Sequence, residues 1–427
     1  MTSRAVAVTG VGLVTPAGIG AQATWEGMRD ATSYATPDAL LAGLPVDFSC
    51  AVPDWQPDTV LGRPLSRRLD HPAQMAVLAA REALADAGLS PSCWDPRRVG
   101  VIIGAGTASF QQLHDVYSKI LTDRHELVSP VALPRSLPSA PVCAVALDLG
   151  AQGMSFAPAA ACASGAVAIG LALQLLRGGS LDVVVAGGAE SGRSMISAVC
   201  FSQMGALSTR RGDPSAAARP FDVDRDGFVL GEGAGILVLE SLDHARTRRA
   251  RVHSYLTGYG ISTDAHHVTA PHPEGRGLKQ ALHDALSDAS WTPADVDHIN
   301  AHGTSTHLND LIEARVLSDV FPRVPPVTAT KGALGHALGA SGAIEAALTV
   351  LTLRHQSIPP TANLDRPDPA LPGLDIVTKS PRPARLRTAI STSVAFGGHN
   401  AVLAFRSPNE EGDTEVRTRS AADLSRR

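Results

Sequence analysis

The chain has 427 residues, of which 44% are hydrophobic and 18% charged, with a net charge of −4. This composition is typical of a folded protein of two or three domain-sized units and excludes a disordered chain, while the lack of an overall basic field predicts no nucleic-acid partner. The five cysteines include no CxxC pair, which argues against a disulfide framework or a zinc site and favours a reducing cytoplasm.

Short β-rich runs and apolar helical segments alternate along the chain. Residues 6–8, 99–103 and 181–186 predict buried parallel strands that end at glycine clusters. Residues 74–87 and 164–176 have the spacing and length of helices. Strands that alternate with helices in this way indicate α/β sheets covered on both faces.

Three further segments complete this prediction. Residues 227–239 and 389–405 predict antiparallel strand pairs with glycine-rich turns. Residues 156–176 carry no charge and are long enough to span a bilayer. Because Pro158 and a cysteine interrupt them, we interpret them as a buried strand, turn and helix and expect no membrane span. The polar segment 407–427 predicts a disordered tail.

The chain repeats itself. Residues 9–15 (TGVGLVT) recur as 257–263 (TGYGIST), and 163–167 (ASGAV) recur as 340–344 (ASGAI). Two weaker echoes, 83–87 with 285–289 and 235–238 with 401–404, fall in the same order. Collinear echoes predict two copies of one fold, at 1–252 and 253–406.

Cys162 stands between an apolar strand-like stretch and an apolar helix, in PAAACASGAVAIG (158–170). A helix N-terminus stabilises a thiolate and can lower a cysteine pKa from ~8.5 toward ~7. A buried cysteine can equally be a small apolar side chain. The matching position in the second copy is Gly339, so the scaffold does not require sulfur, and we predict that Cys162 is a nucleophile.

Two histidines and a lysine lie in glycine-flanked segments of the second copy. His302 follows a predicted strand at 296–300, where α/β folds place ligand-contacting residues, and His336 precedes an apolar helix. A lone histidine is more often structural, but a cysteine with histidines is a pattern of thiol catalysis. Lys331, one of only four lysines, sits in apolar company and needs a partner if buried.

Candidate partners for Lys331 are Asp310, Glu313 and Glu345, although Asp310 and Glu313 also have the spacing of a solvated helix face. Residues 391–400 (STSVAFGGHN) predict a glycine turn whose N–H groups face a developing oxyanion, or an ordinary hairpin. No nucleotide-binding or metalloprotease motif is present, and the fifteen histidines show no metal-ligand spacing.

Together these motifs resemble the elongating beta-ketoacyl-acyl-carrier-protein synthases, a branch of the thiolase superfamily that includes ketosynthases of fatty acid and type II polyketide synthesis. The resemblance runs from VAVTGVG at 6–12 to GGHNAVL at 397–403, with RPFDVDRDGFVLGEGAG at 219–235 as specific as the catalytic motifs. It implies an α/β, thiolase-like five-layer αβαβα sandwich built from two repeated halves.

The resemblance also implies roles for individual residues. Cys162 is the acylated nucleophile, and His302 and His336 support malonyl decarboxylation. Lys331 organises that site. The N–H groups of Cys162 and Phe396 form an oxyanion hole, and Phe396 is also the gate. Glu313 and Asp310 form a supporting network, and Thr304 and Thr306 bind the phosphopantetheine arm. A structural cation site is implied at Asn300, Glu345 and Ser391.

The implied reaction is a decarboxylative condensation of an acyl group on Cys162 with malonyl carrier protein. It needs no free cofactor, because the substrates travel on the phosphopantetheine of an acyl carrier protein. Two histidines separate this pattern from initiating synthases that use acyl-CoA. A non-condensing chain-length subunit and an acyltransferase that stops after loading are the alternatives, and Cys162 with both histidines favours the condensing enzyme.

Carrier proteins are acidic, so exposed arginines are candidate docking charges, namely Arg67, Arg68, Arg210 and Arg211. The resemblance implies a dimer, either with a second copy or with a chain-length-factor-like subunit. His307 stands where many members have proline, and His266 where many have tyrosine. These departures leave the acyl group, the chain length and the choice between fatty acid and polyketide pathways open.

Overall fold

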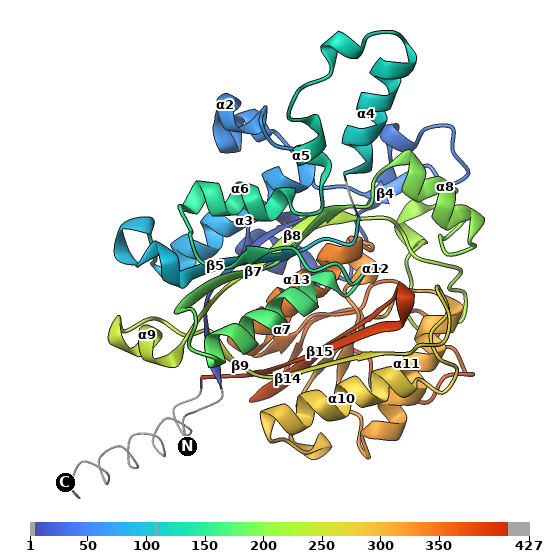
Figure 1. The fold of residues 1–427 in the computed structure, drawn as a ribbon. Helices are drawn as coiled ribbons and strands as arrows, with labels where there is room; N and C mark the ends of the chain where they lie inside the picture. The colour runs from blue at the N-terminus through green and yellow to red at the C-terminus, as the bar shows by residue number, and fades with distance from the viewer. Residues whose placement is uncertain (1–4, 108, 409–427) are drawn as a thin grey trace, which may run out of the picture.

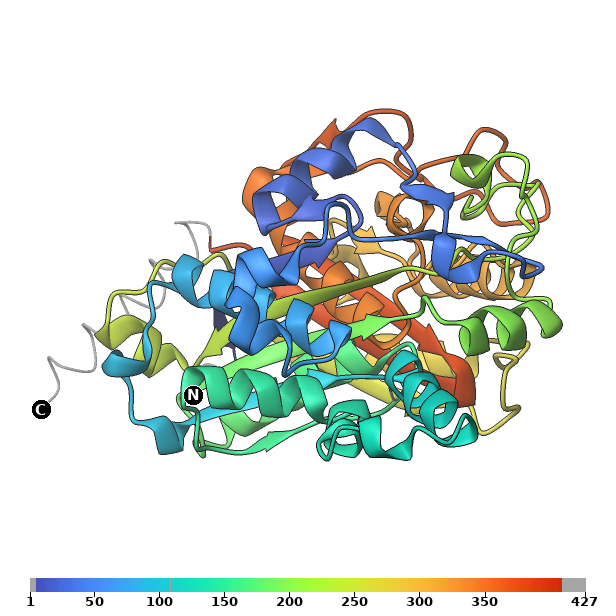
Figure 2. The same cartoon turned by 90° about the horizontal axis from the view of Figure 1, so that it is seen from above.

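A computed structural model of the protein describes residues 5–107 and 109–408. The predicted disordered tail, 407–427, therefore lies outside the described residues from 409 onward. Figure 1 shows two layers of strands separated and flanked by layers of helices, and in the view from above the strands run through the middle of the molecule (Figure 2).

The strands form two sets of five with one topology. In the first set β5 is parallel to β6 and β7, β8 is antiparallel to β7, and β1 is antiparallel to β8. In the second set β10 is parallel to β11 and β14, β15 is antiparallel to β14, and β9 is antiparallel to β15. A short antiparallel pairing of β1 with β9 joins the two sets. The strands are β6 (Ser155–Phe156), β5 (Val99–Gly104), β7 (Val183–Ser191), β8 (Glu232–Glu240) and β1 (Val6–Thr15), then β11 (Val327–Thr328), β10 (Ile299–Asn300), β14 (Thr388–Ala395), β15 (His399–Arg406) and β9 (Ser254–Thr263).

Among the described residues, six helices make the three helical layers. The helices α3 (His71–Ala87) and α6 (Ala140–Leu149) cover the outer face of the first set of strands. The helices α10 (Arg276–Ala289) and α11 (His307–Val320) form the outer layer of the second half. Between the sheets lie α7 (Ser164–Arg177) and α13 (Ser341–His355), which are apolar nearly all round because each has a sheet on both sides.

The remaining elements connect these layers. The helices α4 and α5 project from the sheets at one end of the molecule (Figure 1). These elements are α1 (Ala21–Gly27), α2 (Arg63–Ser66), α4 (Phe110–Leu121), α5 (Ala132–Ser136), α8 (Met195–Gln203), α9 (Leu242–Thr247), α12 (Lys331–Leu334), β2 (Gly18–Ile19), β3 (Ala35–Pro37), β4 (Phe48–Cys50), β12 (Ser357–Ile358) and β13 (Arg382–Pro383).

The sequence echoes mark the same close contact in both halves. A Cβ on Gly10 or Gly12 of β1 would lie 1.9 Å from a carbonyl oxygen of α3. A Cβ on Gly258 or Gly260 of β9 would lie 2.3 or 1.9 Å from a carbonyl oxygen of α10. Each pair of glycines thus lets a helix pack directly on a strand. The thiolase-like sandwich of two repeated halves is confirmed, whereas the boundary at 252/253 stays a prediction.

Most predicted elements are confirmed, including the helices at 74–87 and 164–176 and the hairpin at 389–405, whose turn is the 3-10 segment Phe396–Gly398. The run at 6–8 is a buried strand, but its predicted parallel pairing is wrong, because β1 is antiparallel to both β8 and β9. The antiparallel pair predicted at 227–239 is wrong, because β8 is one strand between β1 and β7. Its glycines make no turn. A Cβ on Gly235 would lie 2.6 Å from the backbone nitrogen of Ile344, so the glycine makes room for α13 instead.

The uncharged segment 156–176 contains the end of strand β6, a turn and the buried helix α7, as predicted, except that the strand is exposed and not buried. Over residues 5–107 and 109–408, no helix has the length and apolar character needed to cross a membrane.

Candidate active site

Cys162 occupies a tight elbow just before α7. Ala161 has a φ of +46° and Ala163 is the N-cap of the helix, so the chain turns sharply at the thiol. The side chain is buried, with 8% of the residue exposed. Residues held with positive φ outside glycine cluster at functional sites, where the surrounding packing maintains them.

The thiol environment differs from the predicted one. Burial raises the pKa of Cys162 to about 12; the positive charge of Lys331 opposes this rise, and the negative charge of Glu190 adds to it. The expectation that the helix N-terminus depresses this pKa is therefore wrong for the free protein. The loss of hydration of a thiolate outweighs the favourable dipole, so the free enzyme carries a protonated thiol.

Two backbone N–H groups lie within hydrogen-bonding reach of the sulfur, one from Phe396 and one from Cys162 itself. Phe396 begins the turn between β14 and β15, which Gly397 and Gly398 complete with φ values of +80° and +75°. The Phe396 ring lies 6.1 Å from that of Phe201. The glycine turn thus aims a backbone donor at the cysteine from the opposite half of the molecule.

The two predicted histidines face each other. His302 follows β10, His336 follows α12, and their rings cross edge to face with centroids 5.5 Å apart. Burial lowers the pKa of both imidazoles well below 6.5, and the charge of Lys331 lowers them further. Both histidines are therefore neutral near pH 7.

Lys331 fixes the orientation of His302. The Lys331 Nζ lies 3.0 Å from Nδ1 of His302 and donates to the His302 carbonyl oxygen at 2.6 Å. Because the ammonium can only donate, Nδ1 accepts and the proton of the neutral ring is on Nε2. Nδ1 of His336 makes a hydrogen bond of 2.9 Å with the Ser341 hydroxyl.

Of the three candidate partners of Lys331, Glu345 makes the buried ion pair. Burial raises the pKa of Glu345 to about 7, and Lys331 opposes that rise. Glu313 instead accepts the backbone N–H groups of His302 and Gly303, both at 2.8 Å, and so shapes the loop that carries the imidazole.

Asp310 also binds backbone, accepting from Phe221 at 2.8 Å and from Ser305 at 3.2 Å. Burial raises its pKa to about 6. The alternative reading of Asp310 and Glu313 as a solvated helix face is wrong, because both are buried.

The Cys162 thiol and the imidazoles of His302 and His336 line one cavity of about 300 Å³, which we call the catalytic cavity. His307 also lines it, whereas His266 packs beside His272 outside it. The Thr304 and Thr306 hydroxyls lie 2.9 Å apart on its wall. The predicted site residues on its wall are Cys162, His302, Thr304, Thr306, His336 and Phe396.

The residues of the predicted cation site lie together beneath the histidines. Asn300 pairs with Ser391 across β10 and β14, and its Nδ2 donates to the Glu345 carbonyl at 3.1 Å. Within the described part of the chain, Asn300 Oδ1, Glu345 Oε2 and Ser391 Oγ are buried without a hydrogen-bond partner. Three such oxygens fit a hard cation, although no cluster of three or more His, Cys, Asp or Glu side chains suited to a metal occurs among the residues described.

The candidate docking arginines divide into two groups. Arg67 and Arg68 are exposed beyond the end of α2. Arg210 donates to the Asp224 carbonyl at 2.6 Å, and Arg211 pairs with Asp47 at 2.6 Å. The second group is therefore already engaged within the chain.

Sequence reasoning missed Glu190. It ends the buried run VVVAGGAE, is 3% exposed, and accepts the N–H groups of Gly106 at 2.9 Å and Gly339 at 2.6 Å. None of the ion pairs among the described residues includes it. A carboxylate that closes an apolar strand was the available signal, because burial of such a group is costly without specific donors.

Residues 3–245 match the beta-ketoacyl synthase N-terminal domain, and residues 253–365 match the beta-ketoacyl synthase C-terminal domain. The chain belongs to the beta-ketoacyl synthase family. It is accordingly a condensing enzyme of the acyltransferase class, as the sequence predicted.

Curated relatives and solved structures agree. The chain is 38% identical to 3-oxoacyl-[acyl-carrier-protein] synthase 2 of Synechocystis sp., over 95% of this chain and 99% of that protein. It is 36% identical to the Staphylococcus aureus enzyme of the same name, over 95% and 98%. It superposes on the ishigamide ketosynthase/chain length factor with a TM-score of 0.88, at 33% identity, over 96% of this chain and 100% of that one. A type II polyketide ketosynthase solved with its acyl-carrier protein and a hexaketide gives a TM-score of 0.87 at 30% identity, over 95% and 100%.

Proposed function

We propose that the protein elongates an acyl group held on Cys162 by decarboxylative condensation with malonyl carrier protein. The observation that carries this proposal is the catalytic cavity, where a thiol facing two backbone N–H groups meets two neutral imidazoles. The thiol with its N–H groups suits covalent capture of the acyl chain, and the pair of imidazoles suits stabilisation of an enolate.

In the first step the Cys162 sulfur attacks the carbonyl carbon of an acyl thioester. The bond from carbon to the pantetheine sulfur breaks, and the Cys162 proton passes through a neutral imidazole to the departing sulfur. The N–H groups of Cys162 and Phe396 hold the developing oxyanion. A base is needed because burial keeps the free thiol protonated, with its pKa raised to about 12.

In the second step malonyl carrier protein loses CO2 and forms an enolate. His302 donates from Nε2, because Lys331 occupies Nδ1, and His336 donates beside it. The enolate carbon attacks the acyl-cysteine carbonyl, the carbon–sulfur bond breaks, and the Cys162 thiolate takes up a proton from solvent. Neutral imidazoles are the right donors here, since they supply hydrogen bonds without protonating the enolate carbon.

The carrier arm enters along the threonine wall. Thr304 and Thr306 are proposed to hydrogen-bond the amides of phosphopantetheine, and Arg67 and Arg68 to meet the acidic carrier protein, with Arg210 and Arg211 as further docking charges. No step needs a free cofactor. A cation held by Asn300, Glu345 and Ser391 would brace the Lys331 ion pair and take no part in a bond change.

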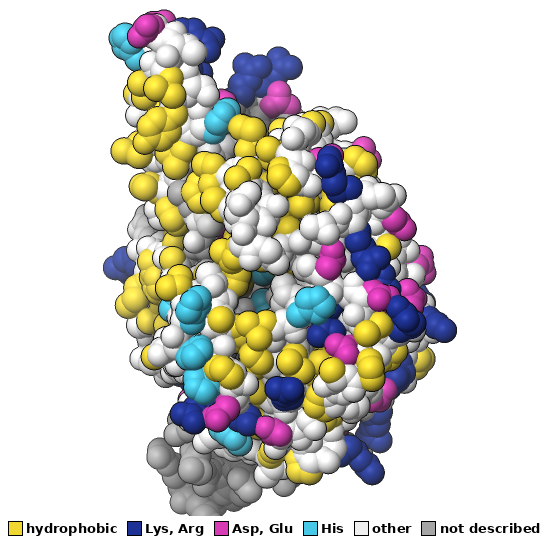
Figure 3. All heavy atoms as spheres, turned by 90° about the vertical axis from the view of Figure 1, so that its right-hand side faces the viewer, with side chains coloured by type: hydrophobic (Ala, Val, Ile, Leu, Met, Phe, Trp, Pro, Cys, Tyr) yellow, Lys and Arg dark blue, Asp and Glu magenta, His cyan; other side chains and the backbone are white. Residues whose placement is uncertain are grey.

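We infer a dimer through the edge of the first set of strands. Its last strand, β6, pairs on one side only with β5. Leu147 of α6, Met154 and Phe156 are exposed beside that edge, and Leu133 and Leu121 continue the apolar surface onto α5 and α4. Figure 3 shows hydrophobic side chains gathered toward the projecting end of the molecule. The partner is a second copy or a chain-length-factor-like subunit, and the expected location is the cytoplasm.

The test uses the purified protein with an acyl carrier protein bearing a medium-chain acyl group and malonyl carrier protein, read by intact mass. An acyl adduct on Cys162 followed by a beta-ketoacyl product supports the proposal and shows that one chain type suffices. An adduct without product points to a missing partner subunit or to an acyltransferase. If no carrier gives an adduct, the assignment of the nucleophile is contradicted, and a non-condensing subunit becomes the favoured interpretation.

A further inference from the structure

Glu190, near the end of β7, lies outside the catalytic cavity, and the proposed reaction does not use it. Its Oε2 accepts the N–H groups of Gly106 at 2.9 Å and Gly339 at 2.6 Å, and its Oε1 accepts the Thr107 hydroxyl. Burial raises the pKa of Glu190, and these donors oppose the rise. Because a backbone N–H can only donate, Oε2 carries no proton, and the arrangement fits an ionised side chain.

The two N–H groups come from opposite halves of the molecule. Gly106 follows β5 in the first half, and Gly339 belongs to the 3-10 turn Leu338–Ala340 in the second. That turn stands between His336 and Ser341, whose hydroxyl makes the hydrogen bond of 2.9 Å with the imidazole. We call residues 336–341 the His336 segment. One carboxylate oxygen therefore connects the segment that carries an imidazole to the first half.

The same carboxylate lies close to the elbow that carries the thiol. A Cβ on Gly106 would lie 3.2 Å from Glu190 Oε2 and 3.0 Å from the carbonyl oxygen of Ala161, the residue before Cys162. A Cβ on Gly339 would lie 2.5 Å from the same Oε2. Both glycines thus bring backbone into direct contact with the carboxylate. Because the contacts leave no free space, a shift of the carboxylate would move the thiol and the imidazole relative to each other.

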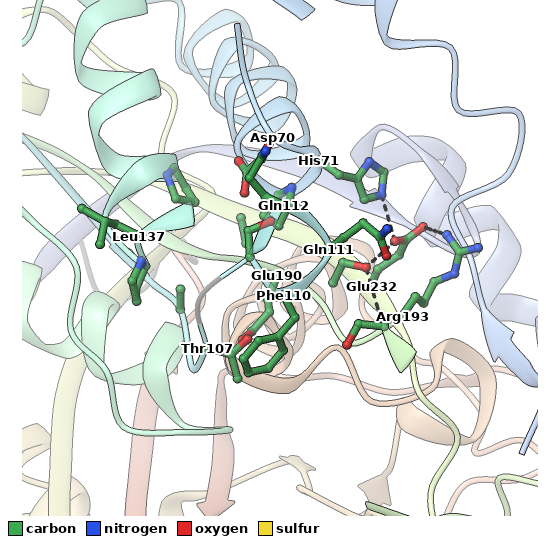
Figure 4. Close-up of a pocket in the computed structure, with 18 of the residues that line it drawn as sticks. Asp70, His71, Thr107, Phe110, Gln111, Gln112, Leu137, Glu190, Arg193 and Glu232 are labelled. Carbon is green, nitrogen blue, oxygen red and sulfur yellow. Dashed lines mark hydrogen bonds and ion pairs between the residues drawn. The ribbon is translucent and has the colours of Figure 1, made fainter. Parts of the chain in front are cut away.

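The charge of Glu190 is not neutralised on its other side. There the side chain lines a second cavity, of about 280 Å³, as Figure 4 shows. Among the described residues of that cavity the basic groups are His71 and Arg193, and each is bound to Glu232 at 2.8 Å. The other acidic residues on its wall are Asp70 and Asp115. The cavity therefore supplies no free cation to offset Glu190.

The Cys162 thiol experiences this charge. Burial raises the pKa of Cys162 to about 12; Lys331 opposes the rise, and Glu190 adds to it. His302 and His336 line the cavity with the thiol, but both are neutral, because burial lowers their pKa well below 6.5. Two opposite charges thus act on the buried thiol, and Glu190 is the one that disfavours the thiolate.

We propose that Glu190 is a positioning residue of the condensation, which joins the His336 segment to the backbone beside Cys162 and whose charge keeps the resting thiol unreactive. This inference rests on the proposed function and gives a role to a residue outside the catalytic cavity. Two substitutions separate the two effects. Glutamine keeps the length and an acceptor oxygen without the charge, and aspartate keeps the charge on a side chain one methylene shorter.

Glu190→Gln tests the charge. The readout is alkylation of Cys162 by iodoacetamide, in protein with serine at the exposed cysteines Cys93, Cys143 and Cys200. We expect the rate to rise by about threefold to tenfold at every pH from about 7 to 10, with an unchanged slope against pH, because one nearby negative charge is lost. Glu26→Gln, at an exposed carboxylate of α1, is the matched control and keeps the wild-type rate.

Glu190→Asp tests the positioning. The readout is single-turnover condensation from pre-acylated protein. We expect the rate to fall by about 10- to 100-fold, because the shorter side chain releases the His336 segment and small misplacements near the reacting atoms are costly. Alkylation of Cys162 in this variant should stay within about twofold of wild type, since the charge remains. Glu190→Gln should condense within about threefold of wild type, because its amide oxygen still accepts the two N–H groups.

Several results would overturn the proposal. Alkylation of Glu190→Gln at the wild-type rate would refute the role of the charge. A plateau near the ordinary cysteine pKa of ~8.5 would do so too, because it means that the site has opened. Unchanged condensation in Glu190→Asp, or an equal loss in Glu190→Gln, would refute the positioning role. Absence of product from wild-type protein would refute the proposed function and the positioning with it, whereas the alkylation comparison needs no acyl substrate, so the failures are distinguishable.

Discussion

The starts of the two central helices, α7 and α13, are the same backbone used for opposite purposes. Ala161-Cys162-Ala163 and Leu338-Gly339-Ala340 match in sequence position, and the first residue of each has a φ close to +47°, at +46° and +48°. In the first copy the middle residue presents a thiol to the catalytic cavity. In the second copy it presents a bare N–H to the carboxylate of Glu190. The elbow at Cys162 therefore carries the nucleophile, whereas the matching elbow at Gly339 binds the carboxylate of Glu190.

The comparison also explains the thiol's resting state. A Cβ on Gly339 would lie 2.5 Å from Glu190 Oε2, so the glycine lets this carboxylate sit next to the cavity that holds Cys162. The charge that closes the second elbow thereby acts on the first. A position at a helix N-terminus does not by itself make a cysteine reactive, because the burial and charges around the elbow set the pKa of the thiol.

The largest effect is expected from removing the sulfur. Cys162→Ala should lower the condensation rate by about 10³-fold or more and abolish the acyl adduct, because no other residue of the cavity can hold the acyl group. Intact mass and product formation measure both. The exposed-cysteine variant Cys200→Ser is the control and should behave as wild type, and an adduct that persists in Cys162→Ala would place the nucleophile elsewhere.

Removing an imidazole should separate the two steps. His336→Ala should retain a measurable acyl adduct but lower product formation by about 10²- to 10⁴-fold, since the enolate loses a donor. Single-turnover assays from pre-acylated protein isolate the condensation step. His283→Ala, on the exposed side of α10, is the control, and an unchanged condensation rate in His336→Ala would contradict the role of His336.

A side chain can be added at the second elbow, at Gly339. Gly339→Ala places a methyl group 2.3 Å from the Gly106 nitrogen and 2.5 Å from Glu190, and should lower the free energy of unfolding by about 1–3 kcal/mol. Urea denaturation measures the change. Gly212→Ala is the matched control, since a Cβ there meets nothing within 4 Å. Equal stability of the two variants would show that the neighbours of Gly339 move to accommodate the methyl group.

The free Cys162 thiol should be alkylated slowly at neutral pH, and the alkylation rate should reach no plateau as the pH rises. Because burial raises the pKa of Cys162 to about 12, its thiolate fraction, and with it the alkylation rate, should rise about tenfold per pH unit from pH 7 to 10. Iodoacetamide labelling followed by mass measures this in a variant with serine at the three exposed cysteines, Cys93, Cys143 and Cys200. A plateau below pH 9 would mean that the helix start outweighs burial after all.

The smallest effect concerns docking. Arg67→Glu with Arg68→Glu should raise KM for the acyl carrier protein by about threefold to tenfold and leave acyl-pantetheine kinetics unchanged, because peripheral charges act on encounter. Arg97→Glu, outside both cavities, is the control. A loss of activity with acyl-pantetheine as well would indicate a structural role instead.

The sequence by itself determined the repeat, the alternation of strands and helices, and the identity of the thiol, imidazole and ammonium groups. These follow from local rules: hydrophobic period, glycine at close contacts, and residue types with few structural uses. The same rules failed at 227–239, where glycines looked like a turn but make room for α13. A glycine shows that space is needed, and only the packed neighbour shows for what.

The tertiary structure alone decided how those groups behave. It brought His302 and His336 together, chose Glu345 rather than Asp310 or Glu313 for Lys331, and put Glu190 beside the thiol. It also reversed the predicted direction of the Cys162 pKa. Desolvation and charge act through space over a few ångströms, and the distance between residues that are separated along the chain is set by the fold, not by their spacing in the sequence.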